Sequence, residues 1–145
     1  MTRPFNTALE CGLRSLFIAN AFNKQGSDLQ RVLFLDHILI HSGDVGGPPS
    51  LHPAVPDRSG EWLVRRKVME NGLNVMVSRE LINKRFSANG IVYSANELTA
   101  LFLQHLKSPY SNQLRERAIW LFQTFETKSF QDLEAIVAAS TRQVK

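Results

Sequence analysis

The sequence comprises 145 residues, a length typical of one domain with a single hydrophobic core. Its 43% hydrophobic and 21% charged residues are typical of a folded protein and exclude a disordered chain. The single cysteine, Cys11, excludes an internal disulfide and a cysteine-based zinc site. No run of about 18 apolar residues is present, and the first residues lack the pattern of a signal peptide. We therefore expect a cytoplasmic protein with no membrane span.

The net charge of +4 is confined to the middle of the chain. Between Arg58 and Arg85 there are seven basic and three acidic residues, whereas the rest of the chain holds ten of each. A localised basic face attracts polyanions, so this segment is the first candidate for a functional surface.

Two helices are predicted in residues 1–42. Thr7 and Glu10 have the spacing of a capping box, and apolar residues then recur on one helical face to about Phe22. Ser27 is the predicted cap of a second helix, which runs from Asp28 to about His41. This helix is apolar nearly all round, which predicts a central position in the fold.

Residues 43–58, GDVGGPPSLHPAVPDR, are rich in glycine and proline. A stretch of this length without periodicity is uncommon in a small domain unless it is functional or packed. Proline favours stiff, extended backbone, so we predict an ordered strap that crosses the surface.

Residues 59–95 are predicted to form a winged helix-turn-helix. Ser59 can cap a helix from Gly60 to about Asn71, and Gly72 is the expected helix stop. A second short helix is predicted from Leu73 to about Glu80.

A β-hairpin completes this predicted motif. Strands at 83–88 and 91–95 flank Asn89-Gly90, a strong signal for a two-residue hairpin turn. Helix, tight turn, helix and hairpin is the order of elements in a winged helix, in which the hairpin is the wing.

Residues 96–145 are predicted to form further helices. Ser94 and Glu97 have capping-box spacing before a helix to about Leu106, Pro109 suits a first helical position, and a last helix starts near Ser129. The expected fold class is mainly α with one β-hairpin: a winged helix-turn-helix-like core with extra N- and C-terminal helices, in a single domain of residues 1–145. The helices carry more apolar surface than one small core requires, so we expect some of it to bind a partner subunit.

A basic face of the winged helix is the candidate nucleic-acid-binding site. In such folds the second helix of the pair lies in the major groove and the wing contacts the flanking backbone. The residues expected to contact DNA are Arg58, Arg65, Arg66, Lys67, Asn74, Ser78, Arg79, Lys84 and Arg85. The alternative is that this basic patch faces a protein partner, because winged helices also serve as protein-binding modules. No base-reading signature is present, which favours contact without sequence specificity.

Four other side chains raise the possibility of a metal site. His37 and His41 are one helical turn apart, with Asp44 and His52 downstream, and such a set could bind zinc. The metalloprotease pattern is missing, and buried histidines more often satisfy structural hydrogen bonds. We therefore predict no metal, no cofactor and no catalytic residue. A metal-dependent hydrolase remains an alternative.

Several segments resemble one bacterial family over about residues 5–125. They are Phe34-Leu-Asp-His, the run from His41 to Pro53, Arg58-Ser-Gly-Glu, Val64-Arg-Arg and the hairpin from Ile82 to Glu97. The resemblance is to the middle component of ABC-three-component systems, the group that includes Lamassu-type antiphage and antiplasmid defence operons. It implies a non-catalytic subunit encoded beside an SMC-like or Rad50-like ATPase and a separate effector, commonly a nuclease.

The resemblance also marks a family signature, expected to be structural or to contact a subunit: Asp44, Gly46, Gly47, Pro48, Pro49, His52 and Pro53. Glu80 departs from the pattern of winged helices, which often have glycine before the wing. The first hypothesis is an accessory subunit that bridges the ATPase and the effector nuclease and contacts double-stranded DNA. The alternative from another class is a stand-alone winged-helix transcription regulator.

Overall fold

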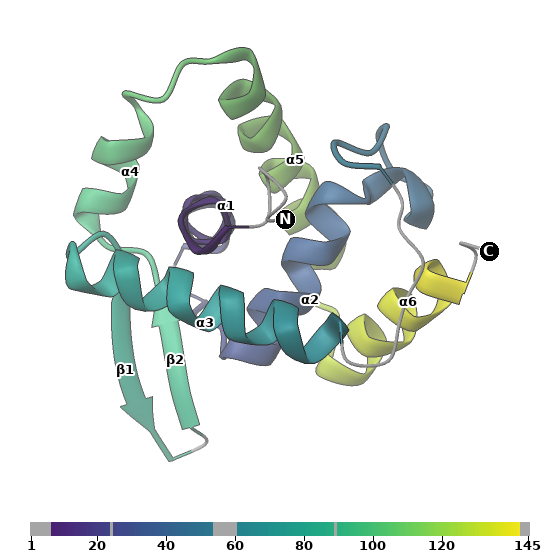
Figure 1. Cartoon of the computed structure of the whole chain (residues 1–145), viewed down its shortest axis with the longest axis horizontal. Helices are drawn as coiled ribbons and strands as arrows, with labels where there is room; N and C mark the ends of the chain where they lie inside the picture. The colour runs from purple at the N-terminus through teal and green to yellow at the C-terminus, as the bar shows by residue number, and fades with distance from the viewer. Residues whose placement is uncertain (1–6, 24, 54–60, 89, 143–145) are drawn as a thin grey trace.

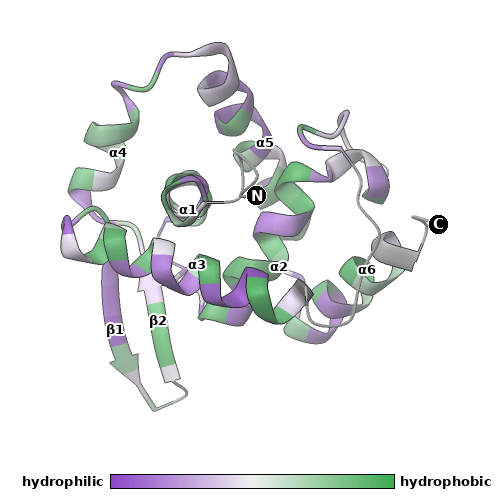
Figure 2. Cartoon of the chain, in the orientation of Figure 1, coloured by the Kyte–Doolittle hydropathy of each residue, from purple (hydrophilic) through white to green (hydrophobic). Residues whose placement is uncertain are grey.

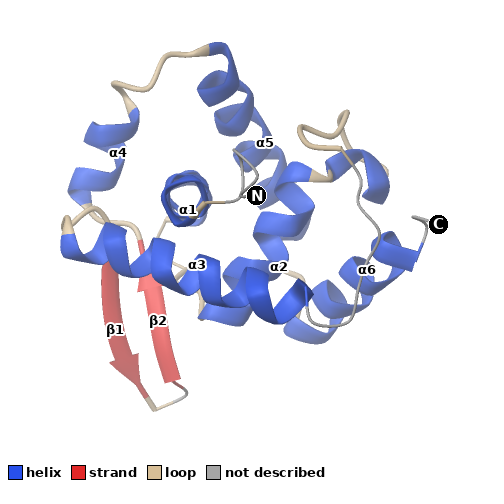
Figure 3. Cartoon of the chain, in the orientation of Figure 1, coloured by secondary structure: helices blue, strands red, loops and turns tan. Residues whose placement is uncertain are grey.

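The computed structural model describes residues 7–23, 25–53, 61–88 and 90–142. Over these residues the chain is mainly helical with one two-stranded antiparallel hairpin, as predicted (Figure 1, Figure 3). The α-helices are α1 (Ala8–Phe22), α2 (Leu29–Ile40), α3 (Glu61–Ser78), α4 (Glu97–Leu103), α5 (Pro109–Phe125) and α6 (Phe130–Arg142). The strands are β1 (Asn83–Ser87) and β2 (Gly90–Ser94), and a short 3-10 helix, η1 (Ser42–Val45), follows α2.

The predicted helix break at Gly72 is wrong, because α3 is one continuous helix of 18 residues. Gly72 lies where α3 packs across α1, which is seen end-on in Figure 1. A Cβ atom at Gly72 would lie 2.4 Å from the carbonyl oxygen of Ala8. Glycine is therefore needed here for close helix packing and does not end the helix. The pair of helices predicted between residues 60 and 80 is not formed in the described part of this segment.

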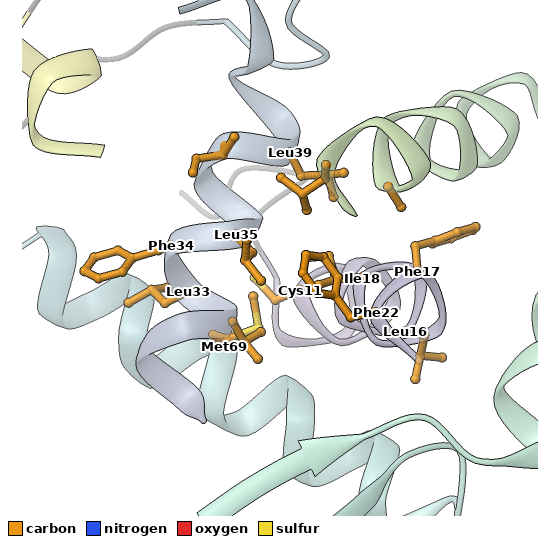
Figure 4. Close-up of a cluster of buried hydrophobic side chains, with 14 of the residues drawn as sticks. Cys11, Leu16, Phe17, Ile18, Phe22, Leu33, Phe34, Leu35, Leu39 and Met69 are labelled. Carbon is orange, nitrogen blue, oxygen red and sulfur yellow. The ribbon is translucent and has the colours of Figure 1, made fainter. Parts of the chain in front are cut away.

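Helices α1 and α2 lie at the centre of the core. Every residue of α2 from Val32 to Ile40 is buried, which confirms the central position predicted from its apolar sequence. Figure 4 shows Cys11 and Ile18 of α1 beside Leu35 of α2, with Met69 of α3 below them. These interlocking side chains fix the positions of the first three helices.

Three predicted helix starts are confirmed. The hydroxyl groups of Thr7, Ser108 and Ser129 each accept a hydrogen bond from a backbone amide in the first helical turn. Pro109 occupies the first turn of α5, where a missing amide hydrogen costs nothing. Local cap chemistry was therefore sufficient to place these starts.

Two other starts are displaced from their predicted caps. Asp28, not Ser27, caps α2, because the backbone of Ser27 instead forms a two-way bridge with Tyr93 of β2. Asn96, not Ser94, caps α4, because Ser94 is the last paired residue of β2. In both cases the residue predicted as the helix cap instead takes part in a strand pairing.

The predicted hairpin is confirmed, and it projects from the helices (Figure 1). Its closing pair is Ser87 with Gly90, one position earlier than a turn centred on Asn89-Gly90; Asn89 itself lies outside the described residues. Glu80 joins α3 to the hairpin with a φ of 61°, in the left-handed region that favours glycine. Glu80 thus adopts the conformation that a glycine would have at this position.

Candidate functional site

The strap folds as an ordered loop over its described part, residues 43–53. The Ser42 hydroxyl donates to the Pro48 carbonyl at 2.8 Å, and the Ser50 hydroxyl oxygen accepts from the Gly43 amide at 2.9 Å. The amides of Leu51 and His52 both donate to the carbonyl of Ile40 at the end of α2. These bonds tie the described part of the strap to itself and to the end of α2. Residues 54–58 lie outside the described residues.

The strap is also tied to α5. Arg117 donates to the Pro49 carbonyl at 2.8 Å, and Nε2 of His52 lies 2.7 Å from the Tyr110 hydroxyl oxygen. Gly47 packs against Trp120, since a Cβ at Gly47 would lie 2.2 Å from the indole ring. Sequence reasoning did not find these three partners on α5, because they lie far along the chain from the strap.

The signature residues divide between packed and exposed positions. Gly47 and His52 are held against α5, and the carbonyls of Pro48 and Pro49 accept side-chain hydrogen bonds. Gly46 has a φ of 80° in the tight turn after η1. The exposed members are Gly46, Pro49 and Pro53, and Asp44 is half-buried. Gly47, Pro48, Pro49 and His52 thus make contacts within the chain, and one of these, Pro49, is also exposed to solvent.

Beneath the strap lies a buried ion pair that the sequence did not predict. Nε and Nη2 of Arg14 donate to the two carboxylate oxygens of Asp36 at 2.7 and 3.0 Å. Both side chains are at most 2% exposed. Burial alone would raise the pKa of Asp36, but the Arg14 guanidinium outweighs it and keeps the pKa below its usual value. The pair therefore remains charged inside the core.

His37 of α2 and His41, the residue that follows α2, lie close enough to Asp36 to interact with it electrostatically. Nε2 of His37 lies 3.1 Å from the Ser140 hydroxyl oxygen in α6, and Nδ1 of His37 lies 3.1 Å from Nη1 of Arg65 in α3. The rings of His37 and His41 are 4.8 Å apart. Burial, with the nearby Arg65 charge, lowers the pKa of His37 to about 3 and that of His41 below its usual value. Both imidazoles are therefore neutral at pH 7, in what we call the polar cluster (Arg14, Asp36, His37, His41, His52, Arg65 and Tyr110).

The basic residues of α3 do not form the single face that we predicted. Arg65 is half-buried, turns inward to His37 and lies 5.0 Å above the ring of Trp62. Arg66 donates to the side-chain oxygen of Gln30, and Lys67 lies 3.6 Å from Glu70. Arg58 lies outside the described residues.

Three cations gather where α3 meets the hairpin. Arg79 and Arg85 are exposed and Lys84 is half-buried, and none of the three side chains has a hydrogen-bond or ion-pair partner among the described residues. We call Arg79, Lys84 and Arg85 the hairpin cations. Asn74 and Ser78 are exposed on α3, and the Ser78 hydroxyl donates to the Val75 carbonyl. Asn74, Ser78 and Arg79 are thus all exposed at the C-terminal end of α3 and just beyond it.

The arrangement does not favour a metal-dependent hydrolase. Both ring nitrogens of His37 already lie within hydrogen-bond distance of other groups, one of them a guanidinium that would repel a metal ion. The described residues contain no group of three or more His, Cys, Asp or Glu side chains placed to hold a metal. Burial raises the pKa of the Cys11 thiol to about 11, so Cys11 is not poised as a nucleophile.

A family model decides the identity of the chain. The model described as ABC-three component (ABC-3C) system Middle Component 2 matches residues 4–145. The chain belongs to this family. No curated protein and no solved structure matches it. The family resemblance expected from the segments around the strap and hairpin is confirmed at this level.

Membership carries two consequences for Middle Component 2. A middle component is one part of a multi-component system, so this chain has partner subunits. The family also supports an accessory, non-catalytic role. Within the described residues, no helix is both long enough and apolar enough to cross a bilayer.

Proposed function

We propose that this Middle Component 2 is a non-catalytic subunit of a Lamassu-type antiphage or antiplasmid complex. It bridges an SMC-like or Rad50-like ATPase and an effector nuclease, as the family resemblance implies. Exposed apolar side chains on the helices offer the surface for these partners. Leu98 and Leu101, one turn apart on α4, are 45% and 53% exposed, and Leu9 on α1 is 57% exposed. Apolar surface of this kind favours subunit contact.

The same subunit contacts double-stranded DNA through α3 and the hairpin. The order α1, the Ser27 bridge, α2, α3, β1 and β2 is the order of a winged helix in which α2 and α3 are the helix pair. In this arrangement the strap is the long connection within the pair, and α3 is the recognition helix.

One observation supports the proposed DNA contact. The hairpin cations are exposed or half-exposed and have no acidic partner among the described residues, whereas Arg65, Arg66 and Lys67 are each engaged within the chain. Cations that are free of intramolecular partners can neutralise phosphates and release counterions without first losing a contact. The DNA-facing surface is therefore centred on the hairpin and the last turn of α3.

The bridging role is tested by purification of the tagged chain after co-expression with its neighbouring genes. We expect the ATPase and the effector to co-purify with it at fixed ratios. A homodimer that shifts a palindromic operator, with no neighbouring gene product attached, would instead identify a transcription regulator.

The DNA contact is tested by charge reversal in the purified complex. Lys84→Glu/Arg85→Glu should weaken duplex binding and lower the slope of log affinity against log salt by about two. The control is Lys107→Glu/Lys128→Glu, which makes the same change in net charge at two exposed positions outside the hairpin. Equal effects of the two variants, or no effect of either, would contradict the proposed surface.

A further inference from the structure

The far end of the hairpin carries a large aromatic side chain that the core does not use. Phe86 of β1 is 76% exposed, the highest value among the large hydrophobic residues described. Its partner across the hairpin is Ile91, which is 36% exposed. The end of β1 that points away from the helices is hydrophobic, whereas the rest of β1 is hydrophilic (Figure 2).

The alternation of the strands explains how Phe86 is presented. Side chains two apart on a strand, and those directly opposite on its partner, share one face. Phe86 therefore shares a face with Lys84, Ile91 and Tyr93. Tyr93 is buried and anchors this face to the core, while Phe86 lies beyond the edge of the core. The hairpin thus holds the ring of Phe86 out from the body of the protein.

The charges around Phe86 indicate what binds there. Lys84 lies on the same face as the ring, whereas Arg85, the preceding residue, lies on the opposite face of the strand. Phe86 is followed by Ser87, and β1 contains no acidic residue. An aromatic ring beside cations matches a nucleic-acid strand, which offers a flat base and an anionic backbone together. A purely apolar partner would match the ring but would leave the cations without counterparts.

We infer that the hairpin tip binds unpaired bases of DNA, with one base stacked on Phe86 and an adjacent phosphate held by Lys84 on the same face. This inference rests on the proposed DNA contact and deepens it. In an intact duplex the bases already stack on one another, so Phe86 gains a base only where pairing is interrupted. The hairpin therefore adds a preference for gapped or single-stranded DNA to the charge-driven binding of duplex.

The test compares Phe86→Ala and Phe86→Trp in the purified complex. The probes are an oligothymidine strand, a duplex that contains a single-stranded gap, and the same duplex without the gap. Phe86→Ala should lose about tenfold in affinity for oligothymidine and for the gapped duplex, with little change for the intact duplex. Phe86→Trp should retain the preference. Ile119→Ala, at a residue of α5 that is 51% exposed, is the control and should bind as the unmodified protein does.

A fluorescent adenine analogue placed in the gap supplies a direct readout, because stacking on an aromatic ring quenches its emission. Quenching that disappears in Phe86→Ala and persists in Phe86→Trp supports the inference. Unchanged affinity of Phe86→Ala for gapped DNA overturns it, as does an equal loss on intact duplex or a loss of the ATPase from the complex. In each of these cases a duplex affinity that still falls in Lys84→Glu/Arg85→Glu leaves the proposed DNA contact standing.

Discussion

Gly12 of α1 and Gly72 of α3 lie backbone to backbone where the two helices cross. A Cβ atom added to Gly72 would be 2.7 Å from the Gly12 nitrogen, and one added to Gly12 would be 2.8 Å from the Gly72 oxygen. Neither position has room for a side chain, since these neighbours are backbone atoms of another helix. The paired glycines therefore set the distance between α1 and α3, and with it the distance between α1 and the hairpin that follows α3.

We predict that Gly72→Ala destabilises the protein, although alanine favours a helix. The helical preference is worth about 1 kcal/mol, and the forced separation of α1 and α3 outweighs it, for a net loss of about 2 kcal/mol. Urea denaturation followed by circular dichroism measures the change. Asn71→Ala, at the exposed neighbouring position, is the control and should change stability by less than about 0.5 kcal/mol. A Gly72→Ala protein as stable as the control would refute the close crossing.

The buried pair of Arg14 and Asp36 predicts a large penalty when one partner is removed. Asp36→Asn leaves the Arg14 charge in the core without a carboxylate, which should cost about 3 kcal/mol. Arg14→Met/Asp36→Leu removes both charges and should recover most of that loss. The exposed pair of Lys67 and Glu70 is the control, and Glu70→Gln should cost less than about 0.5 kcal/mol. Equal losses in Asp36→Asn and the double variant would argue against an isolated buried charge.

Acid should destabilise the protein through its buried histidines. Burial and the nearby Arg65 and Arg14 charges lower the pKa of His37 to about 3 and that of His52 to about 4. The unfolded chain takes up these protons near pH 6.5, whereas the folded chain does not, so folding stability is complete above about pH 6.5 and falls as the pH approaches 4. Each histidine contributes a slope of about 1.4 kcal/mol per pH unit in that window.

The measurement is the free energy of unfolding between pH 7 and pH 4.5. His37→Gln should lower the slope by the contribution of one histidine. Asp36 adds a further loss at lower pH, because its lowered pKa means that its contribution disappears only as the pH falls through the folded-state value. A flat profile from pH 7 to pH 4.5 would show that the histidines are not held neutral.

Two adjacent glycines of the strap should respond differently to alanine. Gly46 has a positive φ but open space around it, so Gly46→Ala should cost about 1 kcal/mol. Gly47 packs on Trp120, so Gly47→Ala should cost about 2 kcal/mol or more. In a Trp120→Ala background the cost of Gly47→Ala should largely vanish, which a double-mutant cycle by thermal unfolding measures. Additive losses would mean that the ring is not the obstacle.

Local chemistry was enough to predict much of the fold. The start of α5 at Ser108-Pro109, the start of α6 at Ser129 and the hairpin all depend on residues within a few positions of one another. A hydroxyl that caps a nearby amide needs no distant partner, so the sequence alone specifies it. The order of helices and hairpin followed from these signals.

The features that were not predicted correctly depend on contacts between residues far apart in the sequence. Gly72 after Asn71 has the pattern of a helix stop, and only the passage of α1 across it shows why the helix continues. Arg65 was among the residues expected to contact DNA, yet in one continuous helix it lies on the same face as the buried Met69 and Gly72. Had the helix been predicted as continuous, this spacing would have indicated that Arg65 points inward.

The buried pair was missed for the same reason. Arg14 lies among apolar residues of α1, and its partner Asp36 is 22 positions further along the chain. The sequence of α1 alone does not identify Asp36 as the partner of Arg14 until the packing of α1 on α2 is known. The polar cluster therefore emerged only from the structure, whereas the basic character of the hairpin was already present in the sequence.

The edge of β1 that faces away from β2 has no strand beside it among the described residues. An uncovered edge presents free backbone donors and acceptors to which a strand of another molecule could attach. Lys84 and Arg85 on this strand oppose such attachment, because two copies would bring like charges together. The cations that attract a polyanion thus also keep separate copies of the protein from joining through their hairpins. Replacing them with neutral residues would expose the chain to self-association even when no DNA is present.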